Sequence, residues 1–198
     1  MTRRNNKSLR QMRPSDPQVR ARFAEACTQP ELLEELAADP ERTVRGAVAA
    51  NPHTPEEVLS RLAGDGDVSV REGVGANPAA TLEILERLAA DDHLVVRQRI
   101  AGREDTPPHL LDRLASDPDY YIRQTVISNP RARPGTKVVA HLCDVLQRQQ
   151  HLPANSWDLE RLRREVSLLT PEQLMDAEHL ARGWRGNLDE FFAVTRDG

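Results

Sequence analysis

Aromatic residues are scarce in this chain of 198 residues, where Phe, Trp and Tyr together make up 4% of the sequence. Leu, Val and Ala must therefore fill most of the core. No apolar run approaches the roughly 18–20 residues that a transmembrane helix needs. The first residues also lack the apolar segment of a signal peptide. We therefore expect a cytoplasmic protein with no membrane partner.

Cysteine is equally rare, since the chain has only Cys27 and Cys143. Two thiols are too few for a closed zinc or iron–sulfur site. The six histidines follow no metal-binding spacing such as H-E-x-x-H. One cluster, Asp91-Asp92-His93, resembles a metal site, but its spacing indicates part of a connecting turn. We expect no cofactor and no metal ion.

Sequence motifs of catalysis are missing too. The chain has no G-x-S-x-G nucleophile motif and no Walker-type glycine loop. An enzyme stays as a third hypothesis, because helical-repeat DNA glycosylases show that repeats of short helices can host chemistry. We match none of their catalytic residues in this chain, so the sequence predicts a protein that is not an enzyme.

What the chain does contain is a unit that repeats every 26 residues. The period is marked by three ladders of identical residues: Asp39, Asp65, Asp91 and Asp117; Arg45, Arg71, Arg97 and Arg123; and Leu36, Leu62, Leu88 and Leu114. A fixed period of 20–50 residues is typical of solenoids, which present extended surfaces.

Residues 39–64 show how one repeat is built. The apolar side of a first helix is formed by Val44, Ala47, Val48 and Asn51, which follow the helical period. Pro52 ends this helix because the residue before a proline is pushed out of the α region. Thr54 is then expected to cap a second helix that starts at Pro55. Each repeat therefore predicts two short helices.

The remaining repeats begin at Asp16, Asp65, Asp91 and Asp117. The first repeat is shorter, with its Asp-Pro pair at residues 16–17 and its Val-Arg pair at residues 19–20. Its irregularity is expected of a terminal repeat.

These repeats resemble the leucine-rich repeat variant (LRV) family. The shared pattern is Asp-Pro, Val-Arg, Val-Ala, Asn-Pro, Thr-Pro, Leu-Leu and Leu-Ala, and it covers about residues 16–142. The resemblance implies an all-α, right-handed superhelical repeat solenoid of about five 26-residue units in which α-helices alternate with 3₁₀-helices. Some members of the family resemble iron–sulfur proteins through an N-terminal cysteine cluster. This chain has no cysteine before Cys27, so that property does not carry over.

Three regions follow from this pattern. We expect residues 1–15 to be a basic flexible arm, residues 16–142 to be the solenoid, and residues 143–198 to be a helical C-terminal cap or docking module. The last region holds four of the seven aromatic residues: Trp157, Trp184, Phe191 and Phe192. Large rings can seal the open end of an array with few residues.

The arginine and aspartate ladders have a structural interpretation and a functional one. Ion pairs between repeats and caps at helix N-termini would explain both ladders. The arginines could instead contact nucleic acid. Asn51, Asn77 and Asn129 form a further ladder at the ends of the first helices. We expect these amides to satisfy backbone groups between layers.

Charge is distributed unevenly along the chain, whose net charge is −4. Residues 16–92 hold 7 basic and 16 acidic side chains, whereas residues 93–142 hold 8 basic and 5 acidic ones. Basic and aromatic side chains gather in the second stretch, and this mixture can hold phosphates and stack on bases. The candidate binding residues are Arg97, Arg99, Arg103, Tyr120, Tyr121, Arg123, Arg131, Arg133 and Lys137.

The leading functional hypothesis is a non-catalytic scaffold that binds a protein partner along the solenoid surface. The acidic half would take a basic segment, and the basic half an acidic one. The alternative is DNA or RNA binding through the basic half and the N-terminal arm. The net negative charge weighs against that alternative, because non-specific affinity for nucleic acid comes mainly from phosphate contacts.

Overall fold

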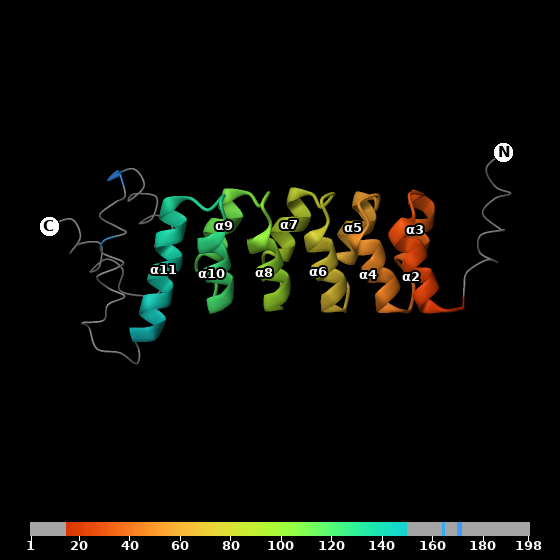
Figure 1. The fold of residues 1–198 in the computed structure, drawn as a ribbon, viewed down its shortest axis with the longest axis horizontal. Coiled ribbons are helices and arrows are strands. Elements are labelled where there is room, and N and C mark those ends of the chain that lie inside the picture. Colours follow the sequence, from red (N-terminus) through yellow and green to blue (C-terminus); the bar gives the residue numbers. More distant parts are fainter. Residues whose placement is uncertain (1–14, 150–163, 165–169, 172–198) are drawn as a thin grey trace. The chain divides into compact units, whose positions relative to one another are not determined.

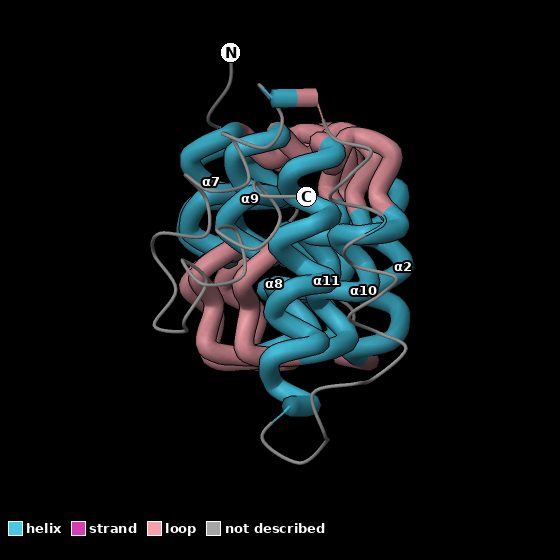
Figure 2. Tube along the Cα trace, turned by 90° about the vertical axis from the view of Figure 1, so that its left-hand side faces the viewer, coloured by secondary structure: helices cyan, strands magenta, loops and turns pink. Residues whose placement is uncertain are grey.

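A computed structural model of the chain describes residues 15–149, 164 and 170–171. Its described part contains helices and turns, with no strand (Figures 1 and 2). The chain divides into two compact units, Met1–Arg99 and Ile100–Gly198. The helices are α2 (Pro17–Ala26), α3 (Pro30–Leu36), α4 (Arg42–Ala50), α5 (Glu56–Leu62), α6 (Val68–Ala76), α7 (Leu82–Leu88), α8 (Leu94–Gly102), α9 (Pro108–Leu114), α10 (Tyr120–Ser128) and α11 (Pro134–Gln149).

Each repeat folds into two helices, as the sequence predicts. The first helices of the first three repeats, α2, α4 and α6, pack side by side (Figure 1). The second helices, α3, α5 and α7, are each seven residues long and form another row. This arrangement confirms the fold class, an all-α repeat solenoid.

The second helices are α-helices rather than the 3₁₀-helices that the family resemblance implies. In α5, the Leu59 amide donates to the Pro55 carbonyl at 3.0 Å, and the Ala63 amide donates to the Leu59 carbonyl at 2.8 Å. These bonds span four residues, which defines an α-helix. Shorter bonds of the 3₁₀ type occur at its ends, where the Asp65 amide donates to the Leu62 carbonyl at 3.0 Å.

The prediction that Thr54 caps the second helix is wrong. Pro55 occupies the N-cap of α5, and no side chain caps that helix end. The Thr54 side chain is buried, and its hydroxyl donates to the Val48 carbonyl at 2.6 Å. Thr106 repeats the bond with the Ile100 carbonyl at 2.6 Å. This threonine therefore closes the end of the first helix by satisfying a carbonyl that the helix itself leaves unpaired.

The first repeat is also aligned differently from the sequence prediction. Asp16 caps α2 by accepting the Gln18 amide, just as Asp67 caps α6 by accepting the Ser69 amide. Asp16 is therefore equivalent to Asp67 and not to the ladder aspartate Asp65. Residues 16–17 have the same Asp-Pro sequence as the start of a repeat, but here it has another role. Pro17 occupies the first position of α2, where a backbone amide would have no partner within the helix.

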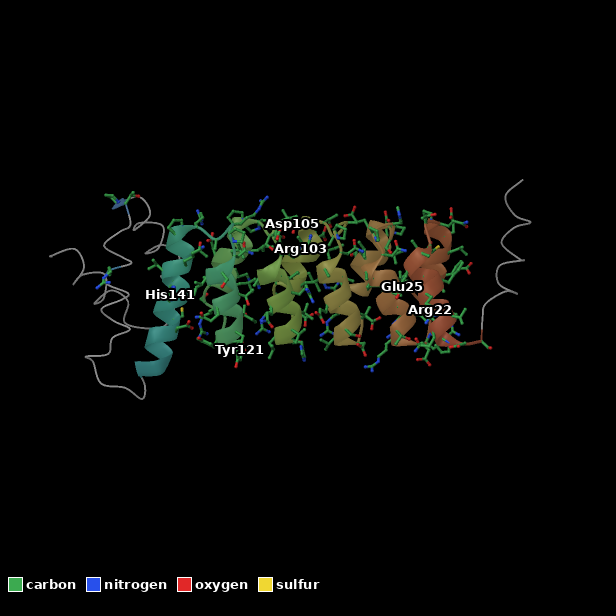
Figure 3. The ribbon with its side chains drawn as sticks, viewed as in Figure 1. Arg22, Glu25, Arg103, Asp105, Tyr121 and His141 are labelled. Atoms are coloured by element: carbon green, nitrogen blue, oxygen red, sulfur yellow. The ribbon has the colours of Figure 1, made fainter. Side chains whose placement is uncertain are left out.

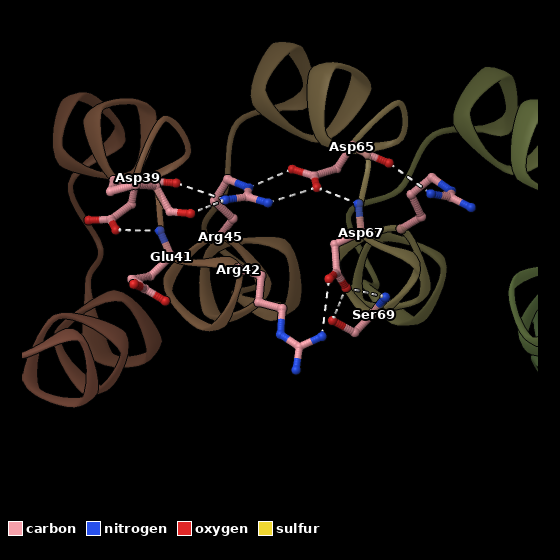
Figure 4. Close-up of polar contacts among 9 residues, drawn as sticks. Asp39, Glu41, Arg42, Arg45, Asp65, Asp67 and Ser69 are labelled. Atoms are coloured by element: carbon pink, nitrogen blue, oxygen red, sulfur yellow. Dashed lines mark hydrogen bonds and ion pairs between the residues drawn. The ribbon is translucent and has the colours of Figure 1, made fainter.

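The ladder arginines join consecutive repeats (Figure 4). Arg45 donates through Nε to Asp65 Oδ2 at 2.7 Å and through Nη2 to Asp65 Oδ1 at 3.0 Å. Its third nitrogen, Nη1, donates to the Asp39 and Pro40 carbonyls, each at 2.9 Å. One guanidinium thus ties the loop before its own helix to the loop of the next repeat, with the two-pronged geometry that suits Arg and carboxylate.

The same two-pronged pair recurs in the first unit. Arg20 donates to Asp39 at 2.8 and 3.0 Å, and Arg71 donates to Asp91 at 2.7 and 3.0 Å. The prediction of Asp–Arg pairs between repeats is therefore confirmed. The prediction that the ladder aspartates cap helices needs correction. Asp65 accepts the Asp67 amide at 2.9 Å, so it orders the loop, and the next aspartate caps the helix.

The asparagine ladder does what the sequence predicts. The Asn77 Nδ2 donates to the Ala49 and Asn51 carbonyls of the preceding repeat at 2.7 and 2.8 Å. Its Oδ1 accepts the Ala79 amide of its own turn at 2.8 Å. Asn129 makes the matching bonds to Ala101 and Arg103 at 2.7 and 2.8 Å. Each side chain is buried and satisfied on both sides, which is what burial of an amide requires.

In the second unit, the ladder ends in a long helix. Arg123 is 1% exposed, and its Nε donates to Asp144 Oδ1 at 2.5 Å. Asp144 lies on α11, one residue beyond the 26-residue register. Helix α11 runs through residues 142 and 143, where the sequence analysis places the boundary of the solenoid. The predicted arm at residues 1–15, apart from Ser15, and most of the predicted cap lie outside the described residues.

Replacing Asp144 by Ala should destabilise the chain by about 3–5 kcal/mol, because it leaves the Arg123 guanidinium buried without its partner. The double variant Arg123→Met/Asp144→Leu should be closer to the parent chain, since it removes both charges from the interior. Urea unfolding followed by circular dichroism measures both effects. A loss below about 1 kcal/mol for Asp144→Ala would contradict the buried pair.

Candidate functional site

Two of the nine predicted binding residues belong to the arginine ladder. Arg97 Nη1 donates to the Asp91 carbonyl at 2.8 Å and to the Asp92 carbonyl at 3.1 Å. Arg123 donates to the Asp117 carbonyl at 2.6 Å in addition to its bond with Asp144. Both guanidinium groups hold loops inside the protein. An incoming phosphate would have to displace these bonds.

Arg99 and Arg103 are four residues apart in the sequence, and they engage different carboxylates. Arg99 Nη2 lies 2.5 Å from Glu72 Oε1, and the arginine side chain is about half exposed. Arg103 donates to both oxygens of Asp105, at 2.8 and 2.7 Å, and its side chain is only 8% exposed. The pair with Asp105 also lowers the pKa of that carboxyl group. Each of the two arginines therefore already has a carboxylate partner in its own unit.

The basic turn after α10 is partly neutralised as well. Arg133 pairs with Asp112, a buried carboxylate that also accepts the Thr136 hydroxyl. Arg131 is exposed and Lys137 is half-buried. Neither of these two side chains makes an ion pair within residues 15–149. Of the predicted basic cluster, only Arg131 and Lys137 thus stay available to an anionic partner.

The two tyrosines stand at the beginning of α10. Tyr120 is 40% exposed and Tyr121 67%, and their rings meet edge to face with centroids 5.6 Å apart. Arg131 follows the opposite end of this nine-residue helix, so about 13 Å of helix separates the rings from the basic turn. Figure 3 shows that Tyr121 and the Arg103–Asp105 pair also lie at opposite edges of the second unit. The expected interleaving of basic and aromatic residues does not form.

Glutamates form a more continuous feature, which the sequence analysis did not single out. Glu31, Glu57 and Glu83 lie in the first turns of α3, α5 and α7, are spaced 26 residues apart, and are all exposed. None of the three makes an ion pair within the described residues. We call these three residues the glutamate row. The sequence signal that marks the row is its 26-residue spacing, the same period as that of the Asp and Arg ladders.

The arginines on the same helices do not neutralise this row. Arg61 donates to the Glu34 carbonyl of the preceding second helix, and Arg87 donates to the Ser60 carbonyl, both at 3.3 Å. The two arginines therefore serve the joints between second helices. The row therefore keeps its negative charge. Each glutamate also interacts favourably with the positive end of the helix dipole, because it lies in the first turn of its helix.

Metal-site geometry is not found in the described part of the chain. No group of three or more His, Cys, Asp or Glu side chains there could hold an ion. Asp91, from the Asp91-Asp92-His93 cluster, accepts Arg71 and the His93 amide. Both cysteines are free thiols and buried, and burial raises the pKa of Cys143 to about 11. None of the described helices is long and apolar enough to cross a membrane.

The fold and these contacts define the class of protein. It is a helical-repeat protein in which Arg–Asp ion pairs and asparagine hydrogen bonds join consecutive repeats. Residues 42–67, one full period of the repeat, match the family model described as Leucine rich repeat variant. The match confirms the resemblance seen in the sequence. No curated protein and no solved structure matches the chain.

Hydrogen bonding keeps the Asp65 and Asp91 carboxylates ionised. Burial alone would raise the pKa of Asp65, but bonds from Arg45 and the Asp67 amide outweigh it and lower that pKa. Asp91 shows the same balance with Arg71. The Ser69 hydroxyl and amide, with Arg42, lower the pKa of Asp67 to about 2 (Figure 4). In turn, the hydrogen bond to Asp65 raises the pKa of Arg45.

Acid should therefore weaken the stacking of repeats. Carboxyl groups with a lowered folded pKa stabilise the protein fully above their unfolded pKa, near about 4, and this contribution is lost as pH falls through the folded values. We expect the melting temperature to drop between pH 4 and pH 2. Arg71→Gln should lower the melting temperature at pH 6 and show a smaller further drop in acid. Equal acid losses in both chains would rule out the Arg71–Asp91 pair as a cause.

Proposed function

We propose that this protein is a non-catalytic, cytoplasmic scaffold that binds a basic segment of another protein through the glutamate row. The observation that carries the proposal is that Glu31, Glu57 and Glu83 recur on consecutive second helices, exposed and without ion pairs among the described residues. Helical repeat arrays generally present extended surfaces to partners. The LRV repeat at residues 42–67 supports this kind of use.

Spacing suggests the form of the partner. Neighbouring packed helices lie roughly 8–10 Å apart, and an extended peptide in the polyproline II conformation advances about 3.1 Å per residue and places every third side chain on the same side. A basic side chain at every third residue of an extended segment would therefore meet successive glutamates. Exposed ion pairs contribute little individually, at most about 1 kcal/mol each, so binding through this row should be weak to moderate and sensitive to salt.

The test is titration of the full chain with a peptide that carries lysine at every third position. Glu31→Lys/Glu57→Lys/Glu83→Lys should weaken binding by about tenfold or more, as expected when three modest ion pairs become repulsive. The control variant Glu25→Lys/Glu41→Lys/Asp92→Lys has the same net charge but alters exposed acids outside the row, and Figure 3 shows Glu25 on α2. If both triple variants weaken binding equally, only net charge matters, and the row is not the site.

Nucleic-acid binding is the alternative, and the arginine contacts argue against it. Arg97, Arg99, Arg103, Arg123 and Arg133 all donate to protein oxygens. We expect no gel shift of the full chain with duplex DNA or single-stranded RNA at physiological salt. A shift that weakens steeply with salt, and that is lost in Arg131→Ala/Lys137→Ala, would favour nucleic acid instead.

A further inference from the structure

Two core positions of the repeat are half exposed in α2. Val19 and Phe23 each have a relative exposure of 47%. The pairing of Arg20 with Asp39, which matches that of Arg45 with Asp65, aligns them with Val44 and Val48 of α4. Both of those valines are completely buried, as are the corresponding residues Val70 and Val74 of α6.

The packing of inner repeats explains the difference. Helix α4 packs against two second helices, α3 before it and α5 after it, and α6 likewise packs against α5 and α7. Helix α2 packs against α3, but no second helix precedes it within the described residues. Within the described residues, the face of α2 that carries Val19 and Phe23 therefore has no preceding second helix such as α3 provides for α4 and α5 for α6.

The sequence just before α2 contains the apolar pair that a second helix uses. Leu9 and Met12 are three residues apart. The same spacing joins the leucines buried in α3, α5 and α7, which are Leu33 and Leu36, Leu59 and Leu62, and Leu85 and Leu88. The connection also fits: residues 13–16 would link Met12 to α2, and residues 37–41 link Leu36 to α4.

Charge is complementary as well. In α5 and α7, Arg61 and Arg87 reach back to carbonyls of the preceding second helix. The corresponding residue of α3 is Glu35, which gives this side of the first repeat the opposite sign. The segment before α2 carries Arg10 and Arg13 and no acid.

We propose that residues 8–13 dock on the face of α2 that carries Val19 and Phe23, with Leu9 and Met12 against these two side chains. The proposal replaces the expectation of flexibility, which rested on composition, for residues 8–13 only. It does not depend on the proposed binding of a basic partner.

A double-mutant cycle in the full chain tests the docking. Phe23→Ala and Leu9→Ala/Met12→Ala should each lower the melting temperature by a few degrees. Their combination should lower it no further than the larger single effect, because both changes remove the same contact. The control is Leu82→Ala, since Leu82 is also 47% exposed but lies on α7. Its effect should add to that of Leu9→Ala/Met12→Ala.

Amide hydrogen exchange of the same chains provides a second measurement. Exchange at residues 10–13 should be at least tenfold slower in the parent chain than in Phe23→Ala. Additive effects in the cycle, or equally fast exchange at these residues in both chains, would overturn the proposal. A concentration-dependent dimer mass by light scattering that Phe23→Ala abolishes would also overturn it, because a second copy would then cover the α2 face.

Discussion

The ion pair between the ladder arginine of one repeat and the aspartate of the next is the contact on which the stacked repeats depend. Arg45 donates through Nη1 to carbonyls of the loop before its own helix, and through Nε and Nη2 to the Asp65 carboxylate. Asp65 in turn accepts the Asp67 amide, and Asp67 caps α6 through the Ser69 amide. One side chain therefore fixes its own loop, the loop of the next repeat and the start of the next first helix.

Such a pair contributes more to register than to net stability. Removing two charges from water costs about as much as their attraction returns, whereas one charge buried alone is strongly unfavourable. A slipped stack would leave a guanidinium and a carboxylate without partners in every repeat. The asparagine ladder adds the same kind of constraint, because each Nδ2 needs two carbonyls of the preceding repeat. Apolar contacts alone would let one layer slide over the next, because they are not directional. The directional polar contacts of the two ladders therefore fix the register of the layers.

This arrangement also separates structural charge from surface charge. The recurrent arginines of the ladder donate hydrogen bonds to carboxylates of the protein itself. The glutamate row of the second helices is instead exposed to solvent. Periodic charge is therefore a poor guide to binding in a repeat protein. A recurrent arginine that lies four to six residues after a recurrent aspartate is more readily explained by stacking, and exposure is what distinguishes the two uses.

Much of the fold follows from the sequence because the same local physics recurs in every repeat. The period, the two helices per repeat, the Asp–Arg pairs and the asparagine bonds all come from spacing and hydrogen-bonding capacity. The details that were missed depend on competition between groups. A threonine before a proline usually caps the following helix, but Thr54 is buried, and its hydroxyl closes the helix before it. Local sequence does not show whether such a hydroxyl will donate to a carbonyl of the preceding helix or accept an amide of the following one.

The ends of the array are harder to predict than its middle, for a related reason. A repeat pattern describes a residue whose neighbours on both sides are repeats, and at an end one neighbour is different. Val19 and Phe23 fit the apolar pattern of Val44 and Val48, yet they are half exposed. At the other end, Arg123 has the ladder sequence, but its acid comes from Asp144, on a long helix and one residue out of register. Arg123 thus keeps the requirement of the ladder for a carboxylate, while the residue that meets it changes. The residues that break the period at the ends are therefore the place to look for features specific to this chain.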